Sequence, residues 1–267
     1  MICFAILAHE DEEVLIAQIE NVRRYNPDSK IVVYNGGENP DFARSLDVPI
    51  CPYSRPIAYG NLTPFFLDVM RWLEETNADY EFLVNLDHDM LFIKPGFEQF
   101  LQAMMQGYDV MGPHFQIHNT PYDYPDYGPG ITMWTEWHRW RTFFGADYLA
   151  RYFNPGQVFR RQIVKRLISA LDIGEVEEIW SSAYVFALEE MLFVTAAMQS
   201  GAKCRDYPWD FDESLQFVRH LGNVTNDEIS KAQALKHYYW IHPVKGDSLR
   251  ETDRWLLGSG SGSENEG

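Results

Sequence analysis

Short apolar runs alternate with amphipathic segments along the first half of the chain, and this alternation is the strongest constraint on the fold. Residues 2–8 (Ile-Cys-Phe-Ala-Ile-Leu-Ala) are continuously apolar, as expected for a strand buried on both faces. Residues 10–25 then carry apolar side chains at a helical spacing. The same reading predicts further strands at 31–34, 80–86 and 109–112, and helices at 63–75 and 97–105. Such a βαβ series predicts an α/β fold with a mixed, mostly parallel central sheet flanked by helices.

The rest of the chain divides into an aromatic-rich insertion, further helices and a polar tail. Residues 114–152 are rich in Tyr, Trp and Pro with few aliphatic periods, so a long insertion of irregular loops is expected there. The tail 258–267 consists of Gly, Ser and acidic residues with one Asn, which is typical of a flexible linker. The remaining expected elements are helices over 159–171 and 176–200 and an extended segment over 236–243.

Charge and cysteine content exclude several classes of function. The 267 residues include 39 acidic and 22 basic side chains, giving a net charge of −17. This charge argues against nucleic-acid binding, which needs clustered cations to neutralise phosphates. The three cysteines are widely spaced and match neither a disulfide framework nor a zinc motif. No apolar run approaches the roughly 18 residues of a membrane span, and no signal peptide is recognised, so we expect a cytoplasmic protein.

Asp87 and Asp89 directly follow the predicted strand that ends at Leu86. In extended backbone, residues two apart point to the same side, so both carboxylates can face one cation. Mn²⁺ and Mg²⁺ prefer oxygen ligands and are often held by one or two carboxylates together with substrate phosphates. Ligands also gather at the carboxyl ends of strands in such sheets. The pattern therefore predicts a site for Mn²⁺ or Mg²⁺; the alternative is a pair of carboxylates that only cap a turn.

Glu189 and Glu190 lie in a segment whose apolar residues cover most of the circumference of a helix. A helix of this kind is buried, and burial raises the pKa of a carboxyl group toward the range of a general base. The alternative is that these acids only stabilise the helix N-terminus through its dipole. Either residue is therefore a candidate base.

The acidic motif and its flanks resemble a known family. The strand, the Asp-x-Asp motif and residues 90–96 (Met-Leu-Phe-Ile-Lys-Pro-Gly) resemble the nucleotide-sugar-binding half of GT-A glycosyltransferases. Residues 5–11 (Ala-Ile-Leu-Ala-His-Glu-Asp) and 59–62 (Tyr-Gly-Asn-Leu) are similar to the core-2/I-branching type. The resemblance implies one GT-A-like catalytic domain over 1–257, with a donor-binding half (1–113) and an acceptor half (114–257).

The resemblance also implies roles for particular residues. A divalent ion on Asp87 and Asp89 would bridge the donor diphosphate, with His242 completing the metal site and His237 as the alternative. Lys245 would contact the diphosphate. Glu190 best matches the place of the family's late acidic residue, so the resemblance implies Glu190 as the base and Glu189 as the second candidate. Donor contacts are implied for Ala8, His9, Asn35, Tyr59, Asn61 and, through close backbone approach, Gly156.

Aromatic residues make up 15% of the chain, and some of them are candidates for binding the acceptor sugar. Trp134, Trp137 and Trp140 recur every three residues and would share one face of a helix. Burial of that face is the alternative to a sugar platform. Two further candidates are Trp180 and Trp209.

The resemblance, together with the acidic motif, implies a metal-assisted, inverting hexosyl- or N-acetylhexosaminyltransferase. It would move sugar from a nucleotide-sugar donor, with UDP as carrier, to a hydroxyl of a carbohydrate or glycoconjugate. A retaining course stays open if Glu190 only positions the acceptor. A metal-free variant relying on Lys245 also stays open, because core-2/I-branching enzymes lack a metal-binding Asp-x-Asp. The other classes are a nucleotidyltransferase, a metal phosphohydrolase and a non-catalytic carbohydrate-binding protein; an acidic segment after the first strand argues against the nucleotidyltransferase.

Overall fold

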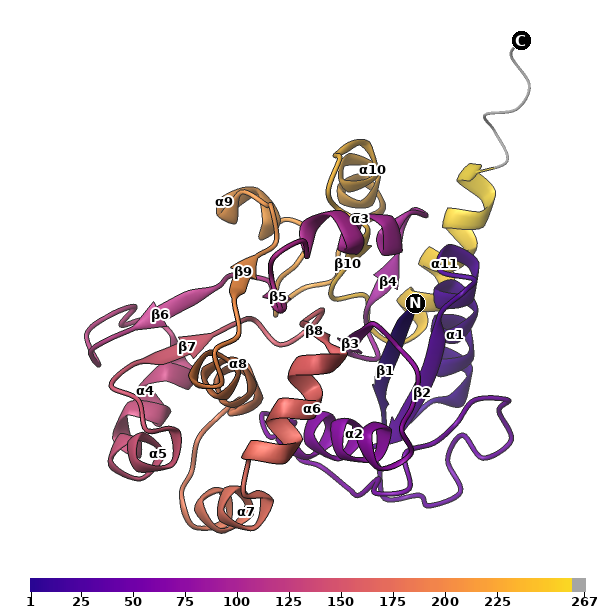
Figure 1. Cartoon of the computed structure of the whole chain (residues 1–267). Coiled ribbons are helices and arrows are strands. Elements are labelled where there is room, and N and C mark those ends of the chain that lie inside the picture. The colour runs from indigo at the N-terminus through magenta and orange to yellow at the C-terminus, as the bar shows by residue number, and fades with distance from the viewer. Residues whose placement is uncertain (261–267) are drawn as a thin grey trace.

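A six-stranded sheet lies between two layers of helices in the computed structural model, which describes residues 1–260 (Figure 1). The strands follow the order β2-β1-β3-β8-β5-β9 across the sheet. β1 is parallel to β2 and β3, β9 is parallel to β5, and β8 is antiparallel to both of its neighbours. The prediction of a mixed, mostly parallel sheet is thus confirmed. The strands are β1 (Ile2–Ala8), β2 (Lys30–Asn35), β3 (Phe82–Leu86), β5 (Val110–Gly112), β8 (Val158–Arg160) and β9 (Cys204–Asp206).

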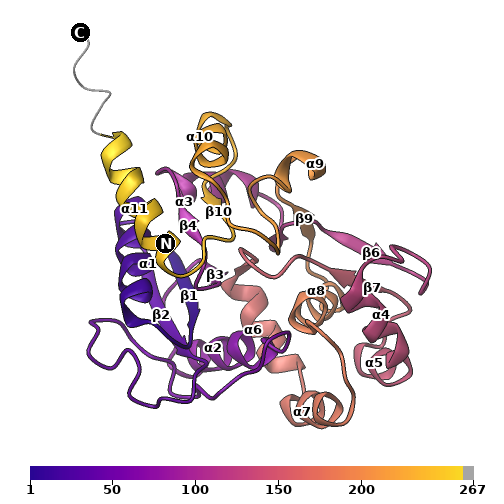
Figure 2. The same cartoon turned by 180° about the vertical axis from the view of Figure 1, so that it is seen from behind.

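Successive side chains of β1 enter two separate cores, one on each face of the sheet. Ile2, Phe4 and Ile6 pack against the first helix layer, and Cys3, Ala5 and Leu7 pack against the second. Figures 1 and 2 show the two layers from opposite sides. The first layer consists of α1 (Glu12–Tyr25), α3 (Phe97–Met104), α10 (Asn226–Ala234) and α11 (Asp247–Gly260). The second consists of α2 (Thr63–Glu75), α6 (Arg161–Ala170), α7 (Ile173–Ser182) and α8 (Glu189–Gln199).

Helix α1 starts and ends where its sequence favours it. The Asp11 carboxylate caps the helix by accepting a hydrogen bond from the Val14 N–H at 3.2 Å. Acidic residues occupy the first turn and basic residues the last, as the helix dipole favours. The buried face includes two polar side chains, Gln18 and Asn21, among its apolar ones. Both of them belong to the site described below.

The insertion 114–152 is more regular than its sequence indicated. Its two short strands pair antiparallel, and residues of its two helices belong to the second core. Trp140 is fully buried and its ring lies 5.8 Å from that of Phe144, so aromatic rather than aliphatic side chains form the packed face. The prediction of irregular loops was therefore wrong for much of this segment. Its elements are β6 (Gln116–His118), α4 (Gly128–Thr135), α5 (Trp137–Phe144) and β7 (Leu149–Arg151).

Three other segments also differ from the sequence-based expectation. The start of the helix expected over 159–171 is strand β8, and α6 follows directly. The helix expected over 176–200 is two helices, α7 and α8, separated by residues 183–188. The extended segment 236–243 contains only the short strand β10 (Trp240–Ile241), which pairs with β4 (Leu91–Phe92). A single-turn helix, α9 (Phe211–Ser214), precedes it.

The end of the described chain is helical. α11 runs through residues 258–260, the first three of the predicted tail, and residues 261–267 lie outside the described range. Across residues 1–260, no helix combines the length and apolar character that crossing a membrane requires.

Candidate active site

Pairing of β10 with β4 brings His242 to the Asp-x-Asp segment. Ile241 lies opposite Leu91 in this antiparallel pair, so the residue after β10 reaches the residues just before β4. The Val244 N–H donates to the Asp89 carbonyl at 2.8 Å and fixes the two segments together. Strand register therefore places an imidazole from the end of the chain beside two carboxylates that follow β3.

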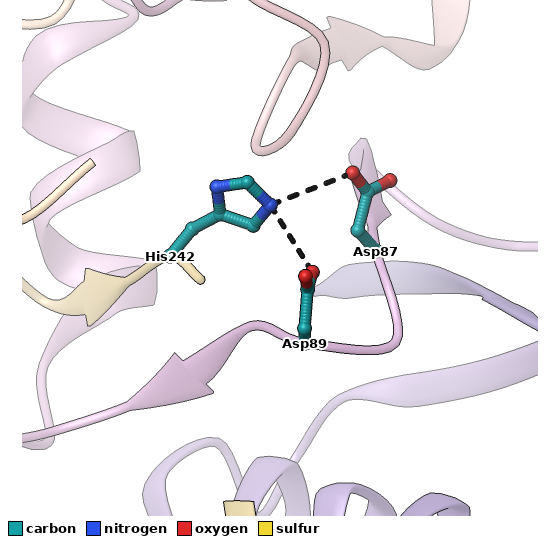
Figure 3. A group of neighbouring side chains, drawn as sticks. All are labelled: Asp87, Asp89 and His242. Carbon is teal, nitrogen blue, oxygen red and sulfur yellow. Dashed lines mark ion pairs between the residues drawn. The ribbon is translucent and has the colours of Figure 1, made fainter. Parts of the chain in front are cut away.

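Asp87, Asp89 and His242 form a compact group of possible metal ligands, and Figure 3 shows their side chains pointing toward one another. One ligand atom from each residue lies within 4.8 Å of the others. His242 Nε2 is 3.1 Å from Asp89 Oδ1 and 3.7 Å from Asp87 Oδ2. Asp89 Oδ1 is buried and accepts no hydrogen bond, so a cation can satisfy it. This donor set fits an ion such as Mn²⁺.

The second ring nitrogen of His242 fixes the direction of the first. His242 Nδ1 is 2.7 Å from the Arg219 carbonyl oxygen, which can only accept, so Nδ1 carries a proton. Nε2 then faces the two carboxylates, where its lone pair can bind a metal. A histidine ligand whose other nitrogen donates to a carbonyl is the usual arrangement in metal sites.

Burial and mutual attraction set the protonation of these three groups. Burial raises the pKa of Asp87 to about 7, although His242 acts against it. Burial also favours a raised pKa for Asp89, but the attraction of His242, His88 and Lys245 lowers it to about 2. Burial alone would lower the pKa of His242, yet the two carboxylates raise it overall. Asp89 is thus ionised at neutral pH, and a bound cation would take the place of a proton on His242 Nε2.

Two polar side chains of α1 form hydrogen bonds with the main chain of the Asp-x-Asp segment and of β4. Gln18 Nε2 donates to the carbonyl oxygens of Asp87 at 2.6 Å and Met90 at 3.1 Å. Asn21 exchanges two hydrogen bonds with the main chain of Phe92. The turn that carries both carboxylates is therefore anchored by helix α1 as well as by the segment after β10.

Asn154 connects the metal group to Glu190. Its side-chain Nδ2 donates to Asp87 Oδ1 at 3.0 Å, and its main-chain N–H donates to Glu190 Oε1 at 3.3 Å. The other carboxylate oxygen of Glu190 accepts from the Tyr127 hydroxyl at 2.5 Å. Burial raises the pKa of Glu190, while Tyr127, Arg151 and the Asn154 N–H oppose that rise. Glu190 thus lies beside the metal group, as its candidate role requires.

Glu189 points to a different neighbour. Its Oε2 accepts from the Leu62 N–H at 3.1 Å and so holds the loop before α2. Burial raises its pKa to about 8, despite the hydrogen bonds donated by its own N–H and by Leu62. At neutral pH Glu189 therefore carries a proton, which suits an anchor and not a base.

The residues at the ends of β1 and β2 that are implied for the donor differ in burial and in the hydrogen bonds that they already make. Ala8 is buried, and its carbonyl accepts from the Gly36 N–H at 2.8 Å. The His9 ring is half-exposed, and its centre lies 4.8 Å from that of His88, the residue between Asp87 and Asp89 in the sequence. The Asn35 side chain is engaged within its own loop, where it bonds Asn39 and Gly37.

The remaining implied donor contacts are placed as follows. Tyr59 is 91% exposed and lies 5.9 Å from Phe186, between ring centres. Asn61 precedes the Leu62 N–H that binds Glu189, and its side-chain oxygen is buried without a hydrogen bond. Lys245 is exposed near the metal group.

Gly156 has a packing explanation of its own. It has a φ of +75°, and a Cβ there would lie 2.3 Å from the Trp240 indole. Trp240 is fully buried, so the close approach at Gly156 is made by this protein side chain. A contact between Gly156 and a donor sugar stays a prediction.

The tryptophans named for the acceptor are mostly packed. Trp140 is fully buried, and Trp134 lies 4.8 Å from Trp137 between ring centres. Trp209 stacks between Tyr207 and Tyr238. Half-buried Trp180 lies under the Arg55 guanidinium at 5.9 Å. Burial accounts for Trp140 and stacking for Trp209.

Sequence reasoning missed three residues that hold the site together: Gln18, Tyr127 and Asn154. Gln18 carried a usable signal, because it is a polar residue inside the apolar stripe of α1. Tyr127 and Asn154 carried none, because each contacts Glu190 from a segment more than thirty positions away in the sequence.

Comparison with known proteins supports the fold. The sequence matches no protein-family model and no curated protein sequence. Among solved structures, the chain is similar to the galactosyltransferase LgtC in complex with donor and acceptor sugar analogues. That likeness has a TM-score of 0.50 and 11% identity, and covers 96% of this chain and 95% of LgtC. At this identity it shows the fold alone: the chain has a GT-A-like fold.

Two further solved structures are less similar. The LgtC active-site mutant Q189E has a TM-score of 0.49 at 10% identity, and the match covers 96% of this chain and 95% of the mutant. The mannosyltransferase PcManGT from Pyrobaculum calidifontis, in complex with GDP-Man and Mn²⁺, has a TM-score of 0.35 at 12% identity. That match covers 69% of this chain and 53% of PcManGT. The specific resemblance to the core-2/I-branching type stays a prediction.

Proposed function

We propose that this protein is a metal-assisted glycosyltransferase that moves a sugar from a nucleoside-diphosphate sugar, with UDP as the first candidate carrier, to an acceptor hydroxyl. The observation that carries the proposal is the Asp87–Asp89–His242 group at the carboxyl edge of a GT-A-like sheet. These three side chains would hold Mn²⁺ or Mg²⁺. When bound, such an ion supplies Lewis-acid stabilisation of the leaving diphosphate. The nearby Lys245 adds a positive charge for the same diphosphate.

Glu190 is the candidate base in this reaction. The acceptor oxygen attacks the anomeric carbon, the bond to the diphosphate breaks, and Glu190 takes the hydroxyl proton. Attack opposite the leaving group inverts the configuration. The raised pKa of Glu190 and its link to Asp87 through Asn154 support this role, and the protonated state of Glu189 argues against it as base. If the product retains the donor configuration, Glu190 instead positions the acceptor.

Thermal unfolding with UDP, GDP and CMP, each with Mn²⁺ and with a chelator, tests the proposal. A ligand that binds only the native state stabilises it by about 2.7 kcal/mol at a hundredfold excess over its dissociation constant. We expect a stabilisation by UDP that requires Mn²⁺. Stabilisation without metal would favour the variant in which Lys245 binds the diphosphate, and no response to any nucleotide would contradict the proposal.

Turnover assays separate the competing reactions. A glycosyltransferase releases UDP from a UDP-sugar and attaches the sugar to the acceptor. A nucleotidyltransferase would instead release pyrophosphate from a nucleoside triphosphate, and a carbohydrate-binding protein would bind sugars without metal-dependent affinity for UDP.

A further inference from the structure

Arg151 is the one buried residue among the lysines and arginines of residues 1–260. Arg151 is the last residue of β7 and is only 8% exposed. Every other Lys and Arg in residues 1–260 is half-buried or exposed. Arg24, Arg55 and Arg219 each bind a carboxylate although they are less buried. A buried charge without a direct ion pair is costly, so the retention of Arg151 calls for an explanation.

The side chains in direct contact with Arg151 are neutral, although its charge also acts on the Glu190 and Asp206 carboxyl groups, whose pKa values it lowers. Its Nε donates to Gln116 Oε1 at 2.7 Å, and its guanidinium carbon lies 3.9 Å from the centre of the Tyr127 ring. Within residues 1–260, neither terminal nitrogen donates a hydrogen bond and no carboxylate comes within ion-pair distance. Two nitrogens of the planar guanidinium therefore remain available, and this is the geometry that binds a carboxylate or phosphate in a bidentate manner.

His118 belongs to the same cluster. It is 1% exposed, and neither ring nitrogen has a hydrogen-bond partner. Its ring centre lies 5.6 Å from that of Tyr127. Burial and the positive charge of Arg151 lower the pKa of His118 to about 4, so the ring is neutral at neutral pH. The buried cluster thus contains polar groups without hydrogen-bond partners and a guanidinium without a direct ion pair.

Arg151 lies at one end of a continuous row that starts at the metal group. Asp87 contacts Asn154, which contacts Glu190. Glu190 in turn contacts Tyr127, whose ring packs on Arg151. In this order the candidate base lies between the place for the donor diphosphate and the buried cation. A group bound at Arg151 would therefore belong to the substrate on the far side of the base from the diphosphate, which is the acceptor.

We propose that Arg151 binds an anionic group, a carboxylate or a phosphate, on the acceptor substrate. The proposal rests on the proposed function, because it assumes that Glu190 acts on an acceptor. It gives the insertion 114–152 a role in acceptor selection, since Gln116, Tyr127 and Arg151 all belong to it. It also explains how a chain of net charge −17 can bind a negatively charged acceptor.

Binding of matched sugars to the full chain, with Mn²⁺ and UDP present, tests this. The probes are methyl glucuronide for a carboxylate, glucose 6-phosphate for a phosphate and methyl glucoside as the neutral reference. We expect at least one charged probe to bind about tenfold to a hundredfold more tightly than methyl glucoside, as a charge-assisted bidentate contact provides. Arg151→Gln should abolish that preference, and Arg151→Lys should keep part of it.

Arg141→Gln is the matched control. Arg141 is an exposed arginine of the same insertion, paired with Asp147, and its loss should leave the preference intact. The ratio of charged to neutral affinity cancels any general effect of Arg151 on Glu190. A wild-type protein without preference for either charged probe would overturn the proposal, as would a preference unchanged in Arg151→Gln. Failure of UDP to bind with Mn²⁺ would contradict the proposed function instead, and the probes then report on Arg151 without nucleotide.

Discussion

The two ring nitrogens of His242 have different roles: Nδ1 orients the ring, and Nε2 faces the carboxylates. Nδ1 is fixed by the Arg219 carbonyl, and Nε2 lies 3.1 Å from a buried oxygen of Asp89. Replacing that oxygen with an amide should therefore remove a metal ligand without disturbing the fold. An asparagine at this position can donate to the lone pair of Nε2 and keep the local contact.

Asp89→Asn should accordingly abolish Mn²⁺-dependent stabilisation and turnover while leaving the unfolding temperature without metal close to that of the wild type. Calorimetric titration with MnCl₂ and a metal-dependent assay of sugar transfer measure the two effects. Asp126→Asn, at an exposed acid of the insertion, is the control and should behave like the wild type. Full transfer by Asp89→Asn with chelator present would exclude the metal role of Asp89.

Glu189 gives a prediction about pH. Burial raises its pKa to about 8 from an ordinary value of 4.5, so the folded chain keeps a proton that the unfolded chain loses. Stability is therefore complete below about pH 4.5 and falls as pH rises toward about 8, by up to about 1.4 kcal/mol per pH unit. Glu189→Gln should remove this fall, so the variant should gain stability relative to the wild type as pH rises.

Urea unfolding at several pH values measures the effect. Glu178→Gln, at an exposed acid of α7, should leave the pH dependence unchanged. Parallel wild-type and Glu189→Gln curves across this window would mean that Glu189 is ionised in the folded protein.

At the scale of residues, the sequence predicts the groups that lie in strand-end motifs better than those that join distant segments. The Asp-x-Asp pair could be found because strand periodicity puts both side chains on one side. His242 was implied by the family resemblance, and register with β4 brings it to the pair. Asn154, Tyr127 and Arg151 could not be found, because each acts through a contact that only tertiary folding creates.

Helix α1 acts as a support for the acidic turn. Its Gln18 side chain binds two carbonyl groups of the segment 87–90, at 2.6 and 3.1 Å. Gln18→Leu keeps the packing volume but leaves those carbonyls without their donor, which costs about 1–3 kcal/mol for each buried unsatisfied group. The same loss should loosen the turn and weaken Mn²⁺ binding by about tenfold, as loss of an outer-shell contact typically does.

Two measurements distinguish positioning from a general loss of stability. Mn²⁺ affinity is measured well below the unfolding temperature of the variant, where it is fully folded. Glu20→Ala, at an exposed site of the same helix, should change neither quantity. Destabilisation with unchanged Mn²⁺ affinity would show that Gln18 has only a structural role.

At the scale of elements, the predictions were correct where a local sequence pattern defines the element. They failed where contacts between distant segments define it. The strands β1, β2 and β3 are short segments rich in apolar residues and were placed to within two residues at each end. Strand β8 was hidden because its three residues lead straight into α6. The break between α7 and α8 was hidden because residues 183–188 contain neither Pro nor Gly; one of them, Ala187, adopts a positive φ of 51°. Helix α5 of the insertion was hidden because two aromatic side chains, Trp140 and Phe144, form its buried face.

The whole molecule is strongly acidic, and this affects the order in which ligands bind. A net charge of −17 attracts a divalent cation and repels a nucleoside diphosphate. Lys245 is an exposed cation close to the three metal ligands, but its single positive charge is small compared with the net charge of −17. We therefore expect Mn²⁺ to bind first and UDP to bind weakly in its absence.

Salt should change the two binding steps in opposite directions. The distance over which charges act shortens from about 10 Å at 0.1 M salt to about 3 Å at 1 M. Screening removes attraction for Mn²⁺, so its affinity should fall with added KCl. It also removes repulsion for UDP, so the weak binding of UDP in chelator should strengthen with the same addition. Calorimetric titrations of each ligand alone at the two salt concentrations provide the comparison, with uridine as the uncharged control. If UDP without Mn²⁺ binds tightly and weakens with salt, local cations such as Lys245 dominate over the net charge, and the diphosphate site works without a metal.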